Sequence, residues 1–487
     1  MCGIAGAIGT PDADIKVKKM LVALEHRGPD ACGTYQAKNL SIGNTLLKIT
    51  GNMAQPLAGK GILAVNGEIF NFKELAAESG IITDSDTEAL FSLIETRINK
   101  GYIPINAVFS VLSSVNGDYA LAYACDNELV LARDPVGVKP LFYSAKKRKG
   151  KLKIIFASEK KAFFTTGRDI KPLSPGSILS FNMKNGSFEE RSLEIKPPHK
   201  RISVESEAVF RLKAVIEKAL ELRLTSTSGI AFSGGIDSTF LAVLAKRINP
   251  ATPLYAVGLP DSHDITQAEK AAEAIGMKNS LRIHLLSVKE IENLIPQIIR
   301  ATESVDPMKI AIGIPLYVVA KIARENGKRV ILTGQGADEL FGGYRRHEVF
   351  LEQGYEVLDR EIYSDIKKIS MVNLERDDMV TMANSIELRV PFLDKDVIKT
   401  GLAIIPDLKV LKKGSLYVRK YIFRKTAEDL LPSEIIWKEK KAIQYGTGVQ
   451  KILNKLAREA GFSQRDGKYI GKYLRMIALE KGFEFIN

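Results

Sequence analysis

Residues 230–239 read Ile230-Ala231-Phe232-Ser233-Gly234-Gly235-Ile236-Asp237-Ser238-Thr239. An apolar run, a glycine pair and a segment with helical spacing indicate a strand, a tight turn and the start of a helix. Around this run, predicted helices at Ser206–Leu222 and Thr239–Ile248 alternate with predicted strands at Ile230–Phe232, Leu254–Val257 and Val330–Leu332. Such alternation is typical of α/β proteins with a parallel, doubly wound sheet.

The glycine turn has the features of an anion-binding loop. Its backbone N–H groups and the N-terminus of the following helix would face phosphates, with two serine hydroxyls assisting. The run lacks the Gly-Lys-Ser/Thr of a Walker A loop and has the pyrophosphate-loop pattern, typical of enzymes that cleave ATP to AMP and pyrophosphate. We therefore expect ATP to be bound by Ser233, Gly234, Gly235, Asp237 and Ser238. A plain strand-to-helix turn is the alternative, and the full match disfavours it.

A second glycine loop follows another short apolar strand and reads Thr333-Gly334-Gln335-Gly336-Ala337-Asp338-Glu339-Leu340-Phe341-Gly342-Gly343-Tyr344. In a parallel sheet, the residues that follow two neighbouring strands meet at one edge. Asp237 and Asp338 would therefore lie together, and two carboxylates suit Mg²⁺, which neutralises charge as pyrophosphate departs. A pair of acidic helix caps is the plainer interpretation, and the two glycine loops argue against it.

The chain changes character near residues 194–201, where prolines and basic residues interrupt every strand and helix pattern. We expect one domain over 1–194 and a second over 204–487. In the first, short β-like runs dominate, at Ile62–Val65, Tyr119–Ala124, Leu129–Ala132 and Leu152–Ala157. This half is predicted to be a sheet-rich α+β domain.

The bulk composition excludes several classes of protein. The chain has 487 residues, of which 45% are hydrophobic and 26% charged, as in ordinary globular domains. No apolar run approaches the ~18 residues of a membrane span, and the first residues do not have the pattern of a secretory signal. The only cysteines are Cys2, Cys32 and Cys125, which suits a reducing compartment. We expect a cytoplasmic protein without a membrane partner.

The net charge of +13 raises the question of nucleic-acid binding, because clustered Lys and Arg release counterions from phosphates. Basic clusters occur at 146–149 and 438–441, but no aromatic-interleaved basic stripe or zinc-ligand pair accompanies them. We expect a solvated, Lys-rich surface and no nucleic-acid partner. An ATP-dependent tRNA-modifying enzyme stays open as an alternative, although it would leave the amino-terminal motifs without a role.

Cys2 is notable for its position. Removal of Met1 would place a free α-amine and a thiol on one residue, and an α-amine with a pKa of about 8 can accept the thiol proton near neutrality. The resulting thiolate can attack an amide carbonyl. An incidental second-position cysteine is the alternative, and it would be preferred if Cys2 stood alone.

Further motifs accompany Cys2, namely His26-Arg27-Gly28-Pro29-Asp30, Asn66-Gly67-Glu68-Ile69-Phe70-Asn71 and Ser85-Asp86-Thr87-Glu88. Asn66, predicted in a turn after the strand Leu63-Ala64-Val65, can donate its side-chain amide beside the Gly67 N–H and form an oxyanion hole. Gly67 allows close backbone approach, while Glu68 and Asp86 supply two carboxylates. Taken singly, the fragments are an Asn-Gly turn and a Ser-x-x-Glu capping box. Together with Cys2 they indicate amide hydrolysis.

These motifs resemble the class II glutamine amidotransferase domain. The resemblance implies an N-terminal nucleophile hydrolase fold, a four-layer αββα sandwich in which Cys2 would release ammonia from glutamine. It assigns glutamine binding to Asn66, Glu68 and Asp86, with Asp86 holding the α-ammonium group. The run Arg133–Leu141 also fits the family.

The second half of the chain, with Asn384–Asp394 and Lys420–Arg424, resembles glutamine-hydrolysing asparagine synthetase. The resemblance implies an adenine nucleotide alpha hydrolase-like domain that uses ATP and Mg²⁺ to convert aspartate into β-aspartyl-AMP. Ammonia from glutamine would then give asparagine, AMP and pyrophosphate. Val257, Thr333 and Gly334 would line the adenylate pocket, and Lys440 would neutralise charge as a catalytic lysine. The sequence does not determine the oligomeric state, and a homodimer is one alternative.

Two positions depart from that family's pattern. The family carries His-x-Arg-Leu-Ser-Ile where this chain reads Asn44-Thr45-Leu46-Leu47-Lys48-Ile49, so Leu46 replaces an arginine that clamps the glutamine α-carboxylate. Leucine forms no ion pair, so Lys48, Arg27 or another base would have to bind the α-carboxylate. Otherwise ammonia itself would be the better nitrogen source. Gln335 stands where glutamate is common, and an amide is no base. An amidotransferase for a different carboxylate and a non-catalytic protein that kept the fold stay open.

Overall fold

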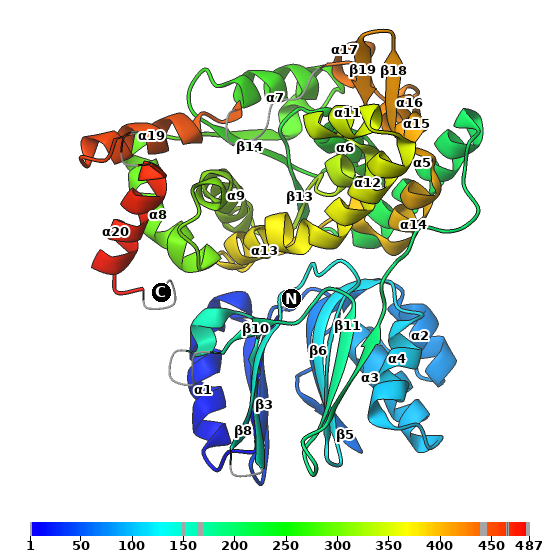
Figure 1. Ribbon diagram of the computed structural model, residues 1–487, viewed down its shortest axis with the longest axis vertical. Helices are drawn as coiled ribbons and strands as arrows, with labels where there is room; N and C mark the ends of the chain where they lie inside the picture. The colour runs from blue at the N-terminus through cyan, green and yellow to red at the C-terminus, as the bar shows by residue number, and fades with distance from the viewer. Residues whose placement is uncertain are drawn as a thin grey trace. The chain divides into compact units, whose positions relative to one another are not determined.

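The structure, a computed structural model, describes residues 2–148, 151–163, 169–438, 446–463, 465 and 467–483. The chain divides into two compact units, Met1–Ile195 and Lys196–Asn487 (Figure 1). Antiparallel sheets form the first unit and a parallel sheet forms the centre of the second. This confirms the predicted order of an α+β domain followed by an α/β domain. Within the described ranges, no helix combines the length and apolar character that crossing a membrane requires.

Two six-stranded antiparallel sheets form the middle of the first unit. The first has the order β10-β8-β9-β1-β3-β2 and consists of β1 (Cys2–Ile8), β2 (Ala31–Ala37), β3 (Leu40–Leu46), β8 (Phe142–Arg148), β9 (Lys151–Ala157) and β10 (Lys171–Pro172). The second has the order β12-β11-β7-β6-β5-β4 and consists of β4 (Leu57–Ala58), β5 (Gly61–Ile69), β6 (Gly117–Cys125), β7 (Glu128–Arg133), β11 (Ser177–Asn182) and β12 (Phe188–Ser192).

Helices cover the outer faces of these sheets (Figure 1). Helix α1 (Ala13–Ala23) packs against β1 and β3, while α3 (Asp86–Asn99) and α4 (Pro104–Leu112) pack against the second sheet, with α2 (Phe72–Ser79) beside α3. Between the sheets lies a fully apolar cluster that includes Ile4 and Ile42 from one sheet and Leu131 from the other. Burial of both inner faces explains the layering, and the αββα sandwich of an N-terminal nucleophile hydrolase is confirmed.

The second unit is organised around five parallel strands in the order β15-β14-β13-β16-β17. They are β13 (Ser228–Ala231), β14 (Leu254–Gly258), β15 (Leu281–Leu285), β16 (Val330–Leu332) and β17 (Glu387–Arg389). The chain builds outward from β13 through β14 to β15, then returns to the other side of β13 for β16. Strand order therefore reverses between β13 and β16, and such a switch point opens a ligand-binding crevice at the carboxyl ends of the strands.

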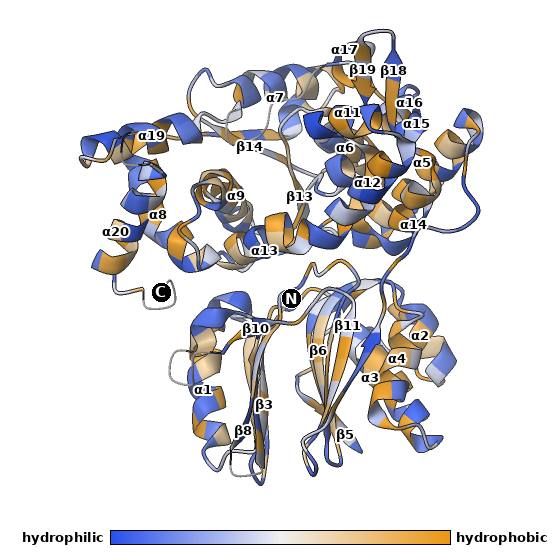
Figure 2. Ribbon diagram, viewed as in Figure 1, coloured by the Kyte–Doolittle hydropathy of each residue, from blue (hydrophilic) through white to orange (hydrophobic). Residues whose placement is uncertain are grey.

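Helices surround this sheet. They are α5 (Glu205–Arg223), α6 (Ile236–Ile248), α7 (His263–Ala274), α8 (Val288–Thr302), α9 (Pro307–Glu325), α10 (Ala337–Phe341), α11 (Arg345–Glu352), α12 (Tyr355–Ile369), α13 (Glu375–Met382), α14 (Lys395–Ala403), α15 (Pro406–Lys409), α16 (Tyr421–Ala427), α17 (Ser433–Ile436), α19 (Val449–Glu459) and α20 (Tyr469–Glu480). A hairpin of β18 (Val410–Lys413) and β19 (Leu416–Arg419) follows α15. Helix α9 is rich in hydrophobic residues (Figure 2) and packs on α8, α13 and β14, because Ile310 and Ile314 are fully buried in the core. The predicted helices and strands of this half are all present, although β13 ends one residue earlier than predicted.

The predicted turn at Asn66-Gly67 is wrong, because both residues lie inside the nine-residue strand β5. Strand β5 pairs with β6 along its whole length, with Asn66 opposite Ala120, and this ladder overrides the local turn preference of Asn-Gly. Gly67 is required by the pairing, because a Cβ there would lie 2.4 Å from the Asp118 carbonyl oxygen. The strand thus carries Asn66 and Gly67 on a rigid element instead of a loop.

Candidate active sites

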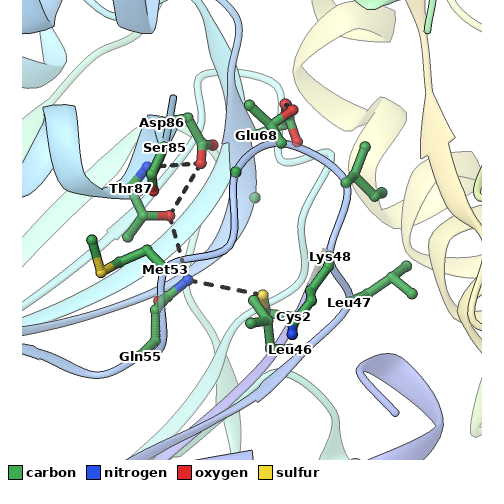
Figure 3. Close-up of a pocket in the computed structure, with 14 residues that line it drawn as sticks. Cys2, Leu46, Leu47, Lys48, Met53, Gln55, Glu68, Ser85, Asp86 and Thr87 are labelled. Carbon is green, nitrogen blue, oxygen red and sulfur yellow. Dashed lines mark hydrogen bonds between the residues drawn. The ribbon is translucent and has the colours of Figure 1, made fainter. Parts of the chain in front are cut away.

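A pocket in the first unit contains most of the residues that the sequence singled out there (Figure 3). Its wall consists of Cys2 at the start of β1 and Leu46 at the end of β3, then residues 47–51, 53 and 55 from the segment between β3 and β4. Gly67 and Glu68 from β5 and residues 85–87 at the start of α3 complete it. Cys2, Gly67, Glu68 and Asp86 are therefore brought together from segments far apart in the sequence.

Asn66 lies directly beside Cys2. The Cys2 backbone nitrogen, which becomes the α-amine when Met1 is removed, donates to Asn66 Oδ1 at 3.3 Å. The Asn66 side chain is fully buried, and its Nδ2 has no acceptor among the described residues. Buried donors are nearly always paired, so an unused amide N–H next to a nucleophile is a donor available for a developing oxyanion.

Burial raises the pKa of the Cys2 thiol above its ordinary value, which favours the protonated form. The positive charge of the N-terminus and a hydrogen bond with the Asn44 side chain act in the opposite direction. A buried neutral thiol needs a local base before it can attack a carbonyl. The nitrogen of the same residue is the nearest candidate for that base.

A chain of hydrogen bonds connects Cys2 to Asp86 (Figure 3). Gln55 Nε2 lies 4.0 Å from Cys2 Sγ and 3.4 Å from Thr87 Oγ1, and this hydroxyl lies 3.3 Å from Asp86 Oδ1. Gln55 Oε1 in turn accepts from the Val65 N–H at 2.8 Å, which fixes the direction of the amide. Sequence reasoning missed Gln55, because nothing in its local pattern distinguishes it, and considered Thr87 only as part of a capping motif.

The two acidic residues of the pocket are held differently. Ser85 caps α3 by accepting from the Glu88 N–H at 3.3 Å, so the N-cap half of the predicted capping box is present, while the Ser85 N–H donates to Thr83 and not to Glu88. Asp86 is fixed by backbone donors, with Oδ2 accepting from the Ile69 N–H at 3.0 Å and Oδ1 from the Thr87 N–H at 2.7 Å. Glu68 accepts from the Thr50 hydroxyl. Both carboxylates line the pocket, where they can attract a cationic group.

Arg27 is excluded as a substitute for the missing arginine at position 46. It is fully buried, its Nε donates to the Cys2 carbonyl at 3.1 Å, and its Nη1 pairs with Glu159 Oε1 at 2.7 Å. Burial alone would raise the pKa of Glu159, but the charges of Lys161, His26 and Arg27 hold that pKa well below its ordinary value. Arg27 therefore supports the backbone of Cys2 and does not line the pocket.

In the second unit, the first glycine loop connects β13 to α6. Gly234 has a φ of +71°, and a Cβ there would lie 2.4 Å from the Gln267 carbonyl oxygen, so a larger residue is excluded on both counts. Ser238 Oγ accepts from the Ser233 N–H at 3.3 Å, and Gly235 is the N-cap of α6. The loop is thus a compact strand-to-helix turn that ends at a thirteen-residue helix.

The second glycine loop lies next to the first at the switch point of the sheet. A Cβ on Gly334 would lie 2.8 Å from the Asp237 Cβ, so glycine permits the close approach of the two loops. Thr333 Oγ1 is buried and has no partner among the described residues. Val257 lies near the end of β14, the strand that pairs with β13 on its other side, and belongs to the apolar core.

Lys420 joins the two predicted metal ligands. Its Nζ lies 2.7 Å and 2.9 Å from the two carboxylate oxygens of Asp237 and 2.7 Å from Asp338 Oδ1. The capping alternative is wrong, because Gly235 and Gly336 are the N-caps of the two helices and make no side-chain cap. The carboxylates converge on one cation, and such oxygen donors also fit Mg²⁺. Within the described ranges, no cluster of three or more His, Cys, Asp or Glu side chains forms a further candidate metal site.

Gln335 is paired with a residue that sequence reasoning missed. Its Nε2 donates to Asp377 Oδ2 at 2.7 Å, and Arg376 Nε donates to the other oxygen of this carboxylate at 2.8 Å. Burial raises the pKa of Asp377. Asp377 follows a π-helical turn, Ser370–Leu374, and such turns are frequent at functional sites. The remaining predicted residue, Lys440, lies outside the described residues.

Comparison with known proteins agrees with both units. Residues 1–192 match a family model described as a glutamine amidotransferase domain, and residues 211–354 and 350–480 match one described as asparagine synthase. A putative glutamine-hydrolysing asparagine synthetase of Methanocaldococcus jannaschii is 34% identical over 566 aligned positions that cover 100% of both chains. Asparagine synthetase B of Escherichia coli is 28% identical, with 93% of this chain and 83% of that protein covered, and a probable asparagine synthetase of Dictyostelium discoideum is 28% identical, with 93% and 86% covered. The chain therefore belongs to the glutamine-hydrolysing asparagine synthetase family and has a class II glutamine amidotransferase domain in its first unit.

Proposed function

We propose that this protein makes asparagine from aspartate, ATP and glutamine. The first unit hydrolyses glutamine and releases ammonia. The second unit joins the β-carboxyl group of aspartate to AMP, and ammonia displaces AMP to form the amide. One observation carries the proposal: the buried, unused N–H of Asn66 beside Cys2, in a chain whose second unit has two glycine loops at the switch point of a parallel sheet.

For the glutaminase reaction, the α-amine of processed Cys2 takes the thiol proton, and the thiolate attacks the side-chain carbonyl of glutamine. Negative charge develops on the carbonyl oxygen, where Asn66 Nδ2 and the Gly67 N–H would donate to it. The protonated amine of Cys2 then gives its proton to the leaving nitrogen, and collapse of the intermediate releases ammonia. Water hydrolyses the remaining thioester to glutamate. Asp86 and Glu68 would hold the α-ammonium group of the substrate, because both carboxylates line the pocket.

For the synthetase reaction, the loop 233–238 and the N-terminus of α6 would hold the ATP phosphates. Asp237 and Asp338 would hold Mg²⁺, which when bound neutralises phosphate charge. Lys420 lies on the same two carboxylates and would add a further positive charge beside the phosphates. The aspartate β-carboxylate attacks the α-phosphorus, and pyrophosphate leaves. Thr333 and Gly334 would border the adenylate that forms.

Ammonia must reach the adenylate without entering bulk water, because protonation removes its nucleophilic lone pair, and we propose passage through an internal tunnel. At the adenylate, Gln335 would orient ammonia. One N–H of its amide donates to Asp377, which fixes the direction of the amide, and Oε1 would accept from an ammonia N–H. Since an amide takes no proton, the proton that the attacking nitrogen loses would pass to water or to the departing AMP phosphate.

The same contact favours a second candidate function, in which the enzyme amidates a different carboxylate. A polar pair of Gln335 and Asp377 offers a substrate other hydrogen-bonding groups than a glutamate at position 335 would. The two candidate functions differ only in which acid is the substrate, because both activate a carboxylate with ATP in the same way.

One assay tests the proposal. The purified enzyme is given ATP, Mg²⁺, glutamine and one acid from a panel that contains aspartate, glutamate and longer amino acids, and AMP, pyrophosphate and the amide product are measured. We expect aspartate to give AMP and asparagine in equal amounts. A higher kcat/KM with another acid would support the second candidate, and formation of ADP and orthophosphate would rule out both.

A further inference from the structure

Free glutamine carries two opposite charges next to each other, an α-ammonium and an α-carboxylate, and a selective glutaminase pocket needs a partner for each. The pocket of the first unit provides two carboxylates, Glu68 and Asp86, for the ammonium group. Leu46 contributes an apolar wall at the end of β3, and Arg27 is enclosed between the Cys2 carbonyl and Glu159. The α-carboxylate therefore needs a different cation.

Lys48 is the one cationic side chain among the described residues that line this pocket. Figure 3 shows it extending toward Cys2 and Leu46. The residue is exposed overall, so its ammonium group remains accessible to a ligand from solution. A flexible, four-carbon stem lets the charge follow a substrate carboxylate at the mouth of the pocket.

The backbone at Lys48 is anchored on both sides by one residue of the preceding motif. Asp30 donates its N–H to the Leu46 carbonyl at 3.0 Å, and its Oδ2 accepts from the Lys48 N–H at 2.9 Å. The segment that leaves β3 is thereby held next to the pocket, and the Lys48 side chain starts from a fixed point. A lysine on a tethered segment loses less conformational freedom on binding than one on a free loop.

We propose that Lys48 binds the α-carboxylate of glutamine and is the residue that makes the glutaminase site selective for a free amino acid. The inference rests on the proposed glutaminase function of the first unit. An ammonium group makes a single, strongly hydrated contact where a guanidinium makes two parallel hydrogen bonds. Glutamine binding through Lys48 is accordingly salt-sensitive, and arginine at this position strengthens it.

The test compares wild type, Lys48→Ala, Lys48→Arg and the matched surface control Lys18→Ala, which lies on the exposed side of α1. Glutaminase kinetics are measured with glutamine and with glutamine α-carboxamide, which lacks the carboxylate. In Lys48→Ala we expect the KM for glutamine to rise about tenfold to a hundredfold with kcat kept, because a hydrogen bond to a charged group is lost. The preference for glutamine over its α-carboxamide falls by the same factor. Lys48→Arg lowers the KM for glutamine below the wild-type value and keeps the preference for glutamine, and Lys18→Ala matches wild type.

A binding measurement separates this role from a structural one. Glutamine affinity is measured by calorimetry in the Cys2→Ala background, where no hydrolysis occurs, with and without Lys48→Ala. We expect the second substitution to weaken glutamine binding and leave binding of the α-carboxamide unchanged. Equal losses of affinity for both ligands, or an unchanged KM and selectivity in an active Lys48→Ala enzyme, would overturn the role of Lys48 and leave the proposed glutaminase function in place. A wild-type enzyme that neither binds nor hydrolyses glutamine would overturn the proposed glutaminase function, and the inference with it.

Discussion

The polar groups of the two candidate sites are in opposite states. In the first unit, the Asn66 amide has a buried N–H for which no acceptor is found in the described part of the chain, next to the Cys2 nitrogen. In the second unit, Asp237 and Asp338 already share the ammonium group of Lys420 at 2.7 Å. The first arrangement is preorganised for a charge that appears only during the reaction, whereas in the second, one ammonium group already offsets half of the charge of two carboxylates and must exchange partners when ligands bind.

The difference follows from what each site must bear in the absence of ligands. An unpaired amide donor costs about 1–3 kcal/mol, which a folded domain can carry at one position. Two carboxylates that converge at the start of two helices repel each other, and leaving both buried and unpaired would cost considerably more. A built-in cation resolves that conflict without a metal. A neutral donor can therefore stay without a partner until the substrate binds, but two neighbouring carboxylates need a counter-charge.

Cys2→Ala tests whether the two sites act separately. The substitution removes the nucleophile, so we expect glutamine-dependent asparagine formation to fall by more than about 10⁴-fold. Asparagine formation driven by ammonium chloride is expected to continue, because the groups proposed for adenylation all lie in the second unit. Loss of both activities in a protein with a wild-type unfolding transition would contradict the separation.

Asn66→Ala tests the preorganised donor. We expect the kcat of glutamine hydrolysis to fall about 10²- to 10³-fold with little change in KM, as when one oxyanion-hole donor is removed elsewhere. The measurement is steady-state glutamate release, with Asn127→Ala in the exposed β6–β7 turn as the control. A loss of less than tenfold would show that the unused N–H does not face the oxyanion.

These sites were predictable from the sequence to the extent that local patterns encode them. The strand, glycine turn and helix at 230–239 follow from spacing alone, whereas Cys2, Gly67 and Asp86 could be grouped only through a resemblance between motifs. The partners Gln55 and Asp377 were missed, and Lys420 was quoted in a motif without a role, because they lie 53, 42 and 183 residues from the groups they contact. Pairing across such separations depends on the tertiary fold, which local propensities do not report.

The turn predicted at Asn66-Gly67 was also wrong because tertiary structure, here strand pairing, outweighs a local preference. The dipeptide carries a strong local turn signal, and the pairing of β5 with β6 overrides it. Leu46 is a further example, because the family resemblance implies a cation at this position, and local sequence does not show which base could take its role. Only the fold shows that Arg27 is enclosed with Glu159 and that Lys48 lines the pocket.

Lys420→Met tests the counter-charge of the second site. Methionine keeps most of the apolar stem, so the change leaves Asp237 and Asp338 without their shared cation, and we expect a loss of about 3 kcal/mol in the free energy of unfolding. Mg²⁺ should restore stability to the variant, in proportion to RT ln(1 + [Mg²⁺]/Kd), and stabilise wild type much less. Unfolding midpoints across a Mg²⁺ titration measure this, with Lys425→Met in α16, the helix that Lys420 precedes, as the control. An identical Mg²⁺ response in all three proteins would contradict the competition between Lys420 and the metal.

Lys409 gives the opposite case to Lys420, because it is a buried cation and the opposite charge that acts on it, Asp359, is not in direct contact with it. Its Nζ has no partner among the described residues, and burial lowers its pKa to about 7, opposed by Asp359 and assisted by Arg201. The unfolded chain keeps this proton up to a pKa of about 10.4, so it binds more protons than the folded protein above pH 7, and stability rises with pH. From pH 7 to pH 9 this group contributes about 2 kcal/mol to that rise. Lys409→Met should remove this part of the rise and be more stable than wild type at pH 7, as urea unfolding at the two pH values will measure. If the variant and wild type gain equally between pH 7 and pH 9, Lys409 is charged in the folded protein and the contrast with Lys420 does not hold.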